Sequence, residues 1–229
     1  MHFKGPNRGG GVIAGTLLLL LSFPALTAEV QVAVLRADGG PLQGAVVTLE
    51  PASPAARSRA AAVPATSPPA VMDQRDLAFV PETLVVRTGA SVDFPNSDKV
   101  RHQVYSFSGA KTFKLALYAG RAHPPVLFDK PGLVTVGCNI HDGMIGYIVV
   151  TDTPWSGRTD AKGAVQIAAV PEGSYTLRIW HPRIADGPEQ LSRPLEIGTG
   201  RAPVTTVSLT RKLKPAQHNH GTNQKWEDY

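Results

Sequence analysis

The sequence predicts an all-β protein. Short runs rich in Val, Leu, Phe and Thr recur along the chain, and Gly, Pro and Asp separate them, as is typical of β-sandwiches and barrels. No stretch has the spacing of a long amphipathic helix. The expected strands are 30–35, 45–49, 77–79, 83–86, 91–94, 102–107, 112–117, 126–128, 133–138, 146–150, 164–168, 175–180, 193–197 and 204–209.

Residues 1–28 have the layout of a secretory signal peptide and are set apart from the fold. The segment has a basic start at Lys4 and Arg8, an apolar run over 12–21 and small residues near Ala28. The apolar run is too short to span a bilayer, although an uncleaved anchor is the alternative, and no later segment is long and apolar enough to cross a membrane. We therefore expect an exported protein, located in the periplasm if the source is a Gram-negative bacterium.

The charge and the cysteine content limit the possible partners. The chain has 23 Lys and Arg against 18 Asp and Glu, a net charge of +5, and loss of Lys4 and Arg8 with the signal leaves 21 − 18 = +3. No basic run is interleaved with aromatic residues, so nucleic acid is not an expected partner. Cys138 is the only cysteine and cannot form an internal disulfide. It is an inert buried thiol, a reactive thiol or a metal ligand.

The composition divides the remaining chain into segments. Ala and Pro supply 13 of the 20 residues in 51–70, which predicts an extended, semi-rigid linker. The connection "RADGGPLQG" at 36–44 is rich in turn residues and predicts a hairpin between the runs on either side of it. Residues 211–229 are polar and without periodicity, and we expect them to form a solvated tail.

A metal loop is the main functional hypothesis. The stretch "VGCNIHDGMIGYIVV" (136–150) places Cys138, His141 and Met144 at three-residue steps. A thiolate, an imidazole and a thioether are soft to intermediate ligands, and two histidines with one cysteine and a weak axial methionine form a blue-copper electron-transfer site. The loop can supply three of these four ligands, so the second histidine must come from elsewhere in the fold.

We choose His102, which begins the expected strand 102–107, as the remote ligand. The other histidines lie in the signal peptide, in the polar tail, beside two prolines or in the C-terminal runs: His2, His218, His220, His123 and His181.

Two blocks then resemble a known family. "LAFVPETLVVRTGASVDFPNSDKVRHQVYSF" and "FDKPGLVTVGCNIHDGMIGYIVV" are similar to the small blue copper proteins, the cupredoxins, and to their plastocyanin and amicyanin types in particular. The resemblance covers residues 71–153 and implies a Greek-key β-sandwich or barrel. It also implies one type 1 copper ion bound by His102, Cys138, His141 and Met144, with His141 partly exposed as the route for electrons.

Two positions depart from the family pattern. The family usually has an asparagine after the remote histidine, which bonds to the residue following the cysteine, whereas this chain has Gln103 facing Asn139. The residue before the histidine is often a proline within an apolar docking surface, whereas here it is Arg101. Neither change removes a ligand, and the arginine favours an acidic partner. Asp98 and Lys99 complete a charged loop that is either a docking element or simply solvated.

The segments that flank this unit carry a second resemblance. "VQVAVLRADGGPLQGAVVTLEP" and "GRTDAKGAVQIAAVPEGSYTLRIWHP" are similar to the two halves of an immunoglobulin-like sandwich of the carboxypeptidase regulatory type. This implies that 29–50 and 154–210 form one sandwich, with Trp155 and Trp180 in its core or rim, and that the copper unit is inserted between them. Two tandem β units are the alternative.

Together these features predict a periplasmic type 1 copper protein that carries single electrons and is not an enzyme. The resemblance implies a redox partner such as a c-type cytochrome or a periplasmic dehydrogenase. The alternatives are a copper-handling protein, or a structural β-sandwich in which the three loop residues are ordinary neighbours. A binuclear centre would need a second cysteine, methionine is foreign to zinc, and Cys138 lacks the helix N-terminus that would activate a catalytic thiol.

Overall fold

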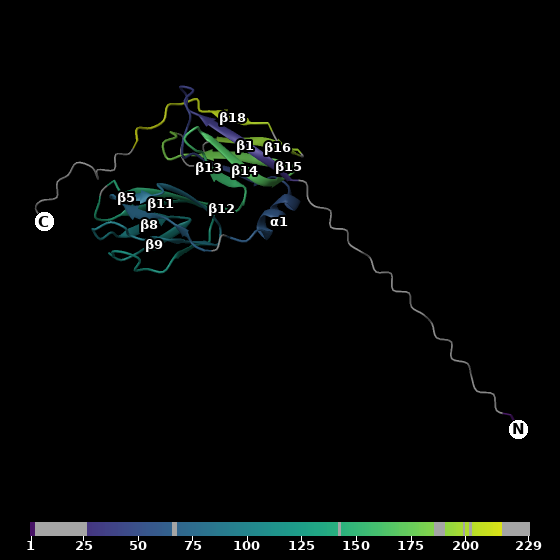
Figure 1. Cartoon of the computed structure of the whole chain (residues 1–229), viewed down its shortest axis with the longest axis horizontal. Helices are drawn as coiled ribbons and strands as arrows, with labels where there is room; N and C mark the ends of the chain where they lie inside the picture. The colour runs from purple at the N-terminus through teal and green to yellow at the C-terminus, as the bar shows by residue number, and fades with distance from the viewer. Residues whose placement is uncertain are drawn as a thin grey trace, which may run out of the picture.

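The computed structural model describes residues 1–2, 27–65, 68–141, 143–185, 191–198, 200–201 and 203–216. This part of the chain is mostly β-sheet with one short helix, which confirms the predicted all-β class (Figure 1). The helix is α1 Pro54–Ala62, and the strands are β1 Thr27–Leu35, β2 Val46–Pro51, β3 Ala70–Val71, β4 Asp73–Arg75, β5 Ala78–Val80, β6 Thr83–Arg87, β7 Ala90–Asp93, β8 Val104–Ser108, β9 Lys111–Lys114, β10 Val126–Phe128, β11 Gly132–Cys138, β12 Ile145–Thr151, β13 Ser156–Arg158, β14 Ala164–Pro171, β15 Gly173–Trp180, β16 Leu191–Ile197, β17 Gly200–Arg201 and β18 Thr205–Ser208.

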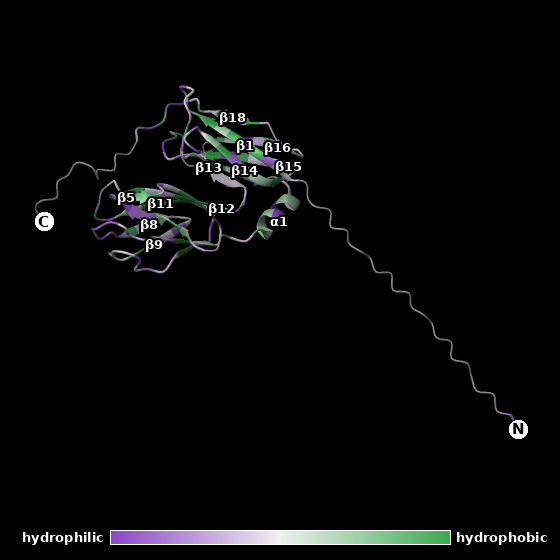
Figure 2. Ribbon diagram, viewed as in Figure 1, coloured by the Kyte–Doolittle hydropathy of each residue, from purple (hydrophilic) through white to green (hydrophobic). Residues whose placement is uncertain are grey.

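The strands at the two ends of the chain form one sandwich. One sheet has the order β14-β1-β17, with β18 also paired to β1, and the other has the order β13-β2-β15-β16. Strand β1 therefore lies among strands from the far end of the sequence (Figure 1). Alternate residues of the strands point inward, and apolar residues are concentrated on strands such as β1 (Figure 2). The buried core contains Val30, Val32, Val34, Val47, Leu49, Tyr175, Leu177 and Ile179.

The predicted hairpin between the first two strands is wrong, because β1 and β2 lie in different sheets. Leu42 is buried in the connection, and its N–H donates to the carbonyl of Val34. The hydroxyl of Thr159 accepts from Ala45 N and donates to Leu42 O, so it ties the connection to the β13 end. The connection thus crosses from one sheet to the other, and both strands bury their apolar faces in one core.

The central unit has a core of its own. Its main sheet has the order β6-β12-β11-β8-β9, and a smaller sheet has the order β10-β7-β3. The inward side chains of β11 are fully or nearly fully buried, as the two-residue period predicts: Val134, Val136 and Cys138. They pack with Phe128 and Ile148 in a core that the structure keeps separate from that of the sandwich.

The segment predicted to be an extended linker contains helix α1, so that prediction is wrong. Alanine has the highest helix propensity, and Ser53 caps the helix by accepting from Ala56 N at 3.2 Å. The guanidinium of Arg87 in β6 donates to the carbonyl oxygens of Ala60 and Val63 at the other end, at 3.1 Å each. The helix is therefore held between the sandwich core, in which Ala60 is buried, and the central unit.

The ends of the described chain modify two further expectations. Residues 211, 212 and 214–216 are exposed, as expected for a solvated tail, but Leu213 packs on the sandwich core and Lys214 and Arg183 exchange two hydrogen bonds. Residues 217–229, with His218 and His220, lie outside the described residues. So do residues 3–26 of the predicted signal peptide, whereas Ala28 is buried in β1.

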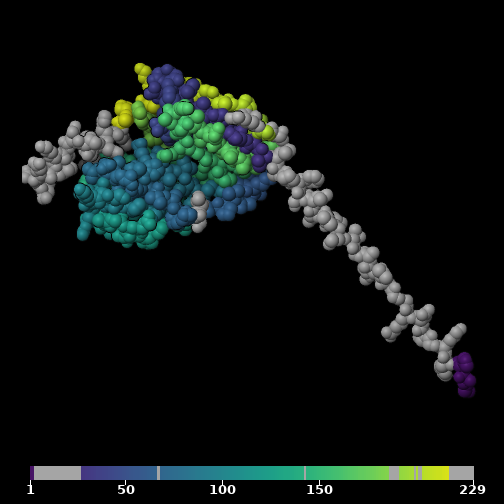
Figure 3. All heavy atoms as spheres, in the orientation of Figure 1, coloured from purple at the N-terminus to yellow at the C-terminus, as the bar shows by residue number. Residues whose placement is uncertain are grey.

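The central unit lies directly against the sandwich (Figure 3). The rings of Tyr147 and Trp180 lie 5.4 Å apart, and the guanidinium of Arg158 donates to the carbonyl of Thr83. A cleft of about 1440 Å³ also lies between the bodies and is lined by residues of both. No helix in the described part of the chain is long and apolar enough to span a membrane.

Candidate metal centre

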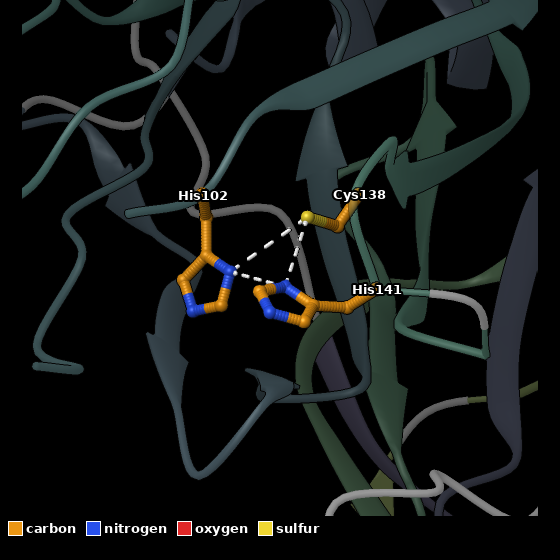
Figure 4. A group of neighbouring side chains, drawn as sticks. All are labelled: His102, Cys138 and His141. Carbon is orange, nitrogen blue, oxygen red and sulfur yellow. Dashed lines mark hydrogen bonds between the residues drawn. The ribbon is translucent and has the colours of Figure 1, made fainter. Parts of the chain in front are cut away.

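Three of the four predicted ligands converge at one end of the central unit (Figure 4). Cys138 is the last residue of β11, and His141 follows in the loop to β12. His102 lies two residues before β8, where its backbone exchanges hydrogen bonds of 2.9 Å in both directions with Tyr118. The Nδ1 atoms of His102 and His141 are 3.0 Å apart, and Cys138 Sγ lies 3.7 Å from the first and 3.5 Å from the second.

These spacings fit a trigonally bound first-row metal ion. Bonds of about 2.0 Å to imidazole nitrogen and about 2.3 Å to thiolate sulfur place the nitrogens roughly 3.5 Å apart and each nitrogen roughly 3.8 Å from the sulfur. The observed triangle has nearly these edges, and its nitrogen pair is slightly closer. Two imidazoles and one thiolate are the equatorial ligand set of a type 1 copper centre.

The hydrogen bonding of His102 explains why its Nδ1 faces His141 and Cys138. Nε2 lies 2.7 Å from Oδ2 of Asp98. A carboxylate only accepts hydrogen bonds, so Nε2 carries the proton and the lone pair of Nδ1 is left for a metal. Sequence reasoning placed Asp98 in a charged loop beside the site but gave it no role toward the ligand. A carboxylate four residues before a ligand histidine is the signal that could have found it.

The three groups differ in exposure. His102 is fully buried, Cys138 is 5% exposed, and His141 is half-buried. Ile140, next to His141 in the sequence, is exposed to 50%, and Val100 and Arg101, just before His102, are also exposed, Val100 to 46%. Of the three groups in the triangle, His141 is therefore the one nearest the surface.

Met144 lies in the same loop and in the same core as Cys138. Its side chain is 2% exposed. Its carbonyl accepts from Cys138 N, and its own N–H donates to His141 O, both at 3.2 Å. Gly143 has φ +88°, so the predicted unusual backbone angle at this glycine is confirmed and lets the loop close in so few residues. The assignment of Met144 as the axial ligand stays a prediction.

The environment of Cys138 favours its thiolate. Burial alone would raise its pKa, but the pairing with His102, hydrogen bonds from the backbone N–H groups of Ile140 and Gln103, and the pairing with His141 lower the pKa to about 6. The sulfur thus accepts backbone donors, as expected for a cysteine at a strand end. The backbone of Gln103 is one of these donors, so this residue supports the loop through its main chain.

The groups around His102 favour its protonated form. Burial favours its neutral form, but the contacts with Cys138 and Asp98 raise its pKa. A proton and a metal cation therefore compete for the same triangle of ligand atoms, as is general for thiolate and imidazole sites.

The remaining described histidines do not join the site. His181 is buried in the sandwich, where its Nδ1 accepts from Arg183 N at 3.2 Å. The ring of His123 meets that of Tyr118 edge-to-face, and its Nε2 lies 3.1 Å from the carbonyl oxygen of Ala116. Within the described residues, His102, Cys138 and His141 are the group whose geometry can hold a metal ion.

Comparison with known proteins gives structural likenesses only. No protein-family model matches the sequence, and no curated protein matches it. A purple cupredoxin from Nitrosopumilus maritimus matches 36% of this chain and 99% of its own, at 19% identity and a TM-score of 0.33. A Cu-containing nitrite reductase from Thermus scotoductus SA-01 matches 52% of this chain but 28% of its own, at 24% identity and a TM-score of 0.35. Amicyanin, in the reduced Cu(I) form of a point mutant, matches 46% of this chain and 98% of its own, at 22% identity and a TM-score of 0.34. These scores are low, so the interpretation of the site rests on the geometry described above.

Proposed function

We propose that this protein is a type 1 copper protein that carries single electrons in the periplasm. The observation that carries the proposal is the triangle of His102 Nδ1, His141 Nδ1 and Cys138 Sγ. Met144 is buried in the same loop, and we assign it as the fourth, axial ligand. Copper bound there supplies a one-electron couple. The protein's own residues supply the positions of the ligands and the exclusion of water.

The support for the ligands is suited to electron transfer. Cys138 is fixed by the sheet, His102 by its bridge to Tyr118 and by Asp98, and the loop by hydrogen bonds between its own backbone groups. Ligands that are held in this way move little between the two oxidation states. A carrier needs this property, whereas an enzyme needs a place for substrate.

The half-buried His141 and its surroundings are the proposed contact with a redox partner. Val100 and Ile140 offer exposed apolar surface, and Arg101 adds positive charge. Such a patch suits an acidic partner, because complementary charge raises the rate of encounter. A c-type cytochrome or a periplasmic dehydrogenase is the class of partner we propose.

Voltammetry of the copper-loaded full chain tests the proposal. We expect a reversible one-electron wave that persists over many cycles. His123→Gln alters a histidine outside the cluster and should leave the wave unchanged. Tightly bound copper that gives no reversible wave would contradict the carrier function and favour a role in copper handling.

A further inference from the structure

The turn between β4 and β5 has an unusual backbone. Arg75 pairs with Ala78, so Asp76 and Leu77 alone make the turn, and their φ angles are +53° and +57°. The sequence predicted that a strand begins at residue 77, but the strand begins at Ala78. Turns of this kind favour Asn-Gly, and a left-handed leucine persists only where its surroundings enforce it.

The group that enforces this turn is the carboxylate of Asp98. Oδ1 accepts from the backbone N–H of Asp76 at 2.6 Å, and Oδ2 accepts from that of Leu77 at 3.1 Å. The same Oδ2 lies 2.7 Å from Nε2 of His102. One oxygen atom therefore joins the hairpin turn to the buried histidine of the metal triangle.

Asp98 is also held from its own loop. Its backbone N–H donates to Oδ1 of Asn96 at 2.9 Å. The amide nitrogen of Asn96 donates in turn to the carbonyls of Val100 and Tyr118. The side chain of Asp98 is only 11% exposed. The loop thus fixes its backbone, while the turn amides fix the direction of its carboxylate.

The other end of the hairpin reaches the methionine side of the site. Phe79 in β5 is 2% exposed and lies against Gly146, where an added Cβ would come within 2.9 Å of the Cβ of Phe79. Gly146 follows Met144 by two residues. The hairpin therefore contacts the segments that carry two of the four proposed ligands.

We propose that the Asp76–Leu77 turn is a positioning element of the metal site. Its two N–H groups orient the carboxylate of Asp98, and this carboxylate fixes the ring angle and the tautomer of His102. The proposal rests on the proposed function only in calling His102 a copper ligand. Asp76 is exposed, so a change in the conformation of this surface turn is transmitted to His102 through three hydrogen bonds, all of which involve the carboxylate of Asp98.

The main test follows the Nε2–H proton of His102 by NMR in the metal-free full chain. In one variant, Gly-Gly is inserted between Asp76 and Leu77, which moves the turn amides away from Asp98. The matched control carries the same insertion between Gly109 and Ala110, in the two-residue turn of the β8–β9 hairpin. We expect the turn insertion to speed exchange of this proton with water by at least about tenfold and to mix the two tautomers. The control should keep the parent rate.

Two substitutions make the result decisive if the insertion prevents folding. Asp98→Asn keeps the shape of the side chain but replaces one of its two acceptor oxygens by an NH₂ group, which cannot accept from the donors that face it. This variant should therefore also speed exchange of the His102 Nε2–H proton. Leu77→Gly keeps both N–H donors and suits the positive φ, so it should keep the parent rate. Parent-like exchange in folded Asp98→Asn, or in the folded turn insertion, would overturn the proposal.

The copper-loaded protein separates this proposal from the proposed function. The turn insertion and Asp98→Asn should shift the reduction potential relative to the parent, and the β8–β9 insertion should not. Faster exchange in the metal-free variants together with a parent chain that forms no type 1 site would support the positioning role and refute the carrier. A reversible copper wave from the parent chain together with unchanged exchange in the metal-free variants would support the carrier and refute the positioning role.

Discussion

Met144 and the two histidines contribute differently to the proposed copper site. The imidazoles and the thiolate define the plane, whereas a thioether binds weakly along the axis and tunes the potential. Met144 is buried against the same core as Cys138, so a substitution of similar volume there should leave the fold intact.

Met144→Leu should raise the reduction potential by roughly 60 mV or more, because loss of the axial donor disfavours Cu(II), and a tenfold change in relative affinity corresponds to about 59 mV for one electron. The copper–thiolate band should remain. Met72→Leu is the matched control, since Met72 is fully buried in the same core but outside the loop. Equal potentials for the two variants in voltammetry would exclude Met144 as a ligand.

His181 should make folding stability dependent on pH. Burial, and next the charge of Arg183, lower the pKa of His181 to about 4. Between an unfolded pKa of about 6.5 and this value the unfolded chain binds more protons, so stability should fall as the pH falls through this window, by up to roughly 1.4 kcal/mol per pH unit. His181→Asn, whose amide oxygen can still accept from Arg183 N, should flatten this dependence in denaturant unfolding from pH 6.5 to 4. A variant that keeps the parent slope would contradict the assignment.

The ligand residues could be predicted from the sequence, whereas the support of His102 could not. Cys138, His141 and Met144 are neighbours in one loop, and the remote histidine could be found by excluding the others. The role of Asp98 in orienting His102 can be recognised only once the fold places the Asp76–Leu77 turn against its carboxylate. Sequence spacing contains no sign that two non-glycine residues adopt positive φ angles.

At the level of elements, the turn before β14 depends on one glycine. Gly163 has φ +71°, its N–H donates to the carbonyl of Asp160 at 2.9 Å, and its carbonyl accepts from Val34 N at 2.8 Å. A Cβ at this position would lie 2.6 Å from the carbonyl oxygen of Val34. The turn therefore holds β14 against the β1 end of the sandwich with no room for a side chain.

Gly163→Ala should lower the free energy of unfolding by roughly 1–3 kcal/mol, from the strained φ and the contact with backbone together. Gly39→Ala is a control with a similar φ of +82° but with nothing within 4 Å of its Cβ, so its loss should be smaller. Chemical denaturation measures both. Equal losses in the free energy of unfolding would show that the contact of an added Cβ with the carbonyl oxygen of Val34 does not destabilise the protein.

The period of two located strands such as β1, β11 and β12, along which burial largely alternates, but it did not fix their partners. The chain between β1 and β2 has hairpin composition, yet each strand pairs with a strand more than 100 residues later. The Ala- and Pro-rich segment was taken for a linker because it has little to bury. Its alanines form a capped helix, and Ala60 is buried in the sandwich core.

At the scale of the whole molecule, two cores share one chain. The core of the central unit draws its buried residues from between positions 72 and 150, and the core of the sandwich draws its own from both flanks. Contacts between the bodies involve Tyr147 with Trp180, Arg158 with Thr83, and Arg87 with Val63, and none of these residues belongs to the metal triangle.

A chain of residues 68–153 should therefore fold and bind copper on its own. We expect the absorption spectrum of its copper complex to match that of the full chain, with a lower thermal midpoint because Arg87 and Tyr147 lose their partners. Circular dichroism and copper titration measure the two properties. An excised unit that folds but binds no copper would show that the sandwich contributes to the site.

The most direct test of the copper site is titration of the metal-free full chain with Cu(II), followed by absorption. A centre formed by His102, Cys138 and His141 should bind one copper ion and develop an intense thiolate-to-copper band at about 600 nm. Cys138→Ser should lose this band, and Ser106→Ala, a buried hydroxyl change away from the triangle, should keep it. A parent protein that binds copper without the band, or a Cys138→Ser variant that stays blue, would contradict the account.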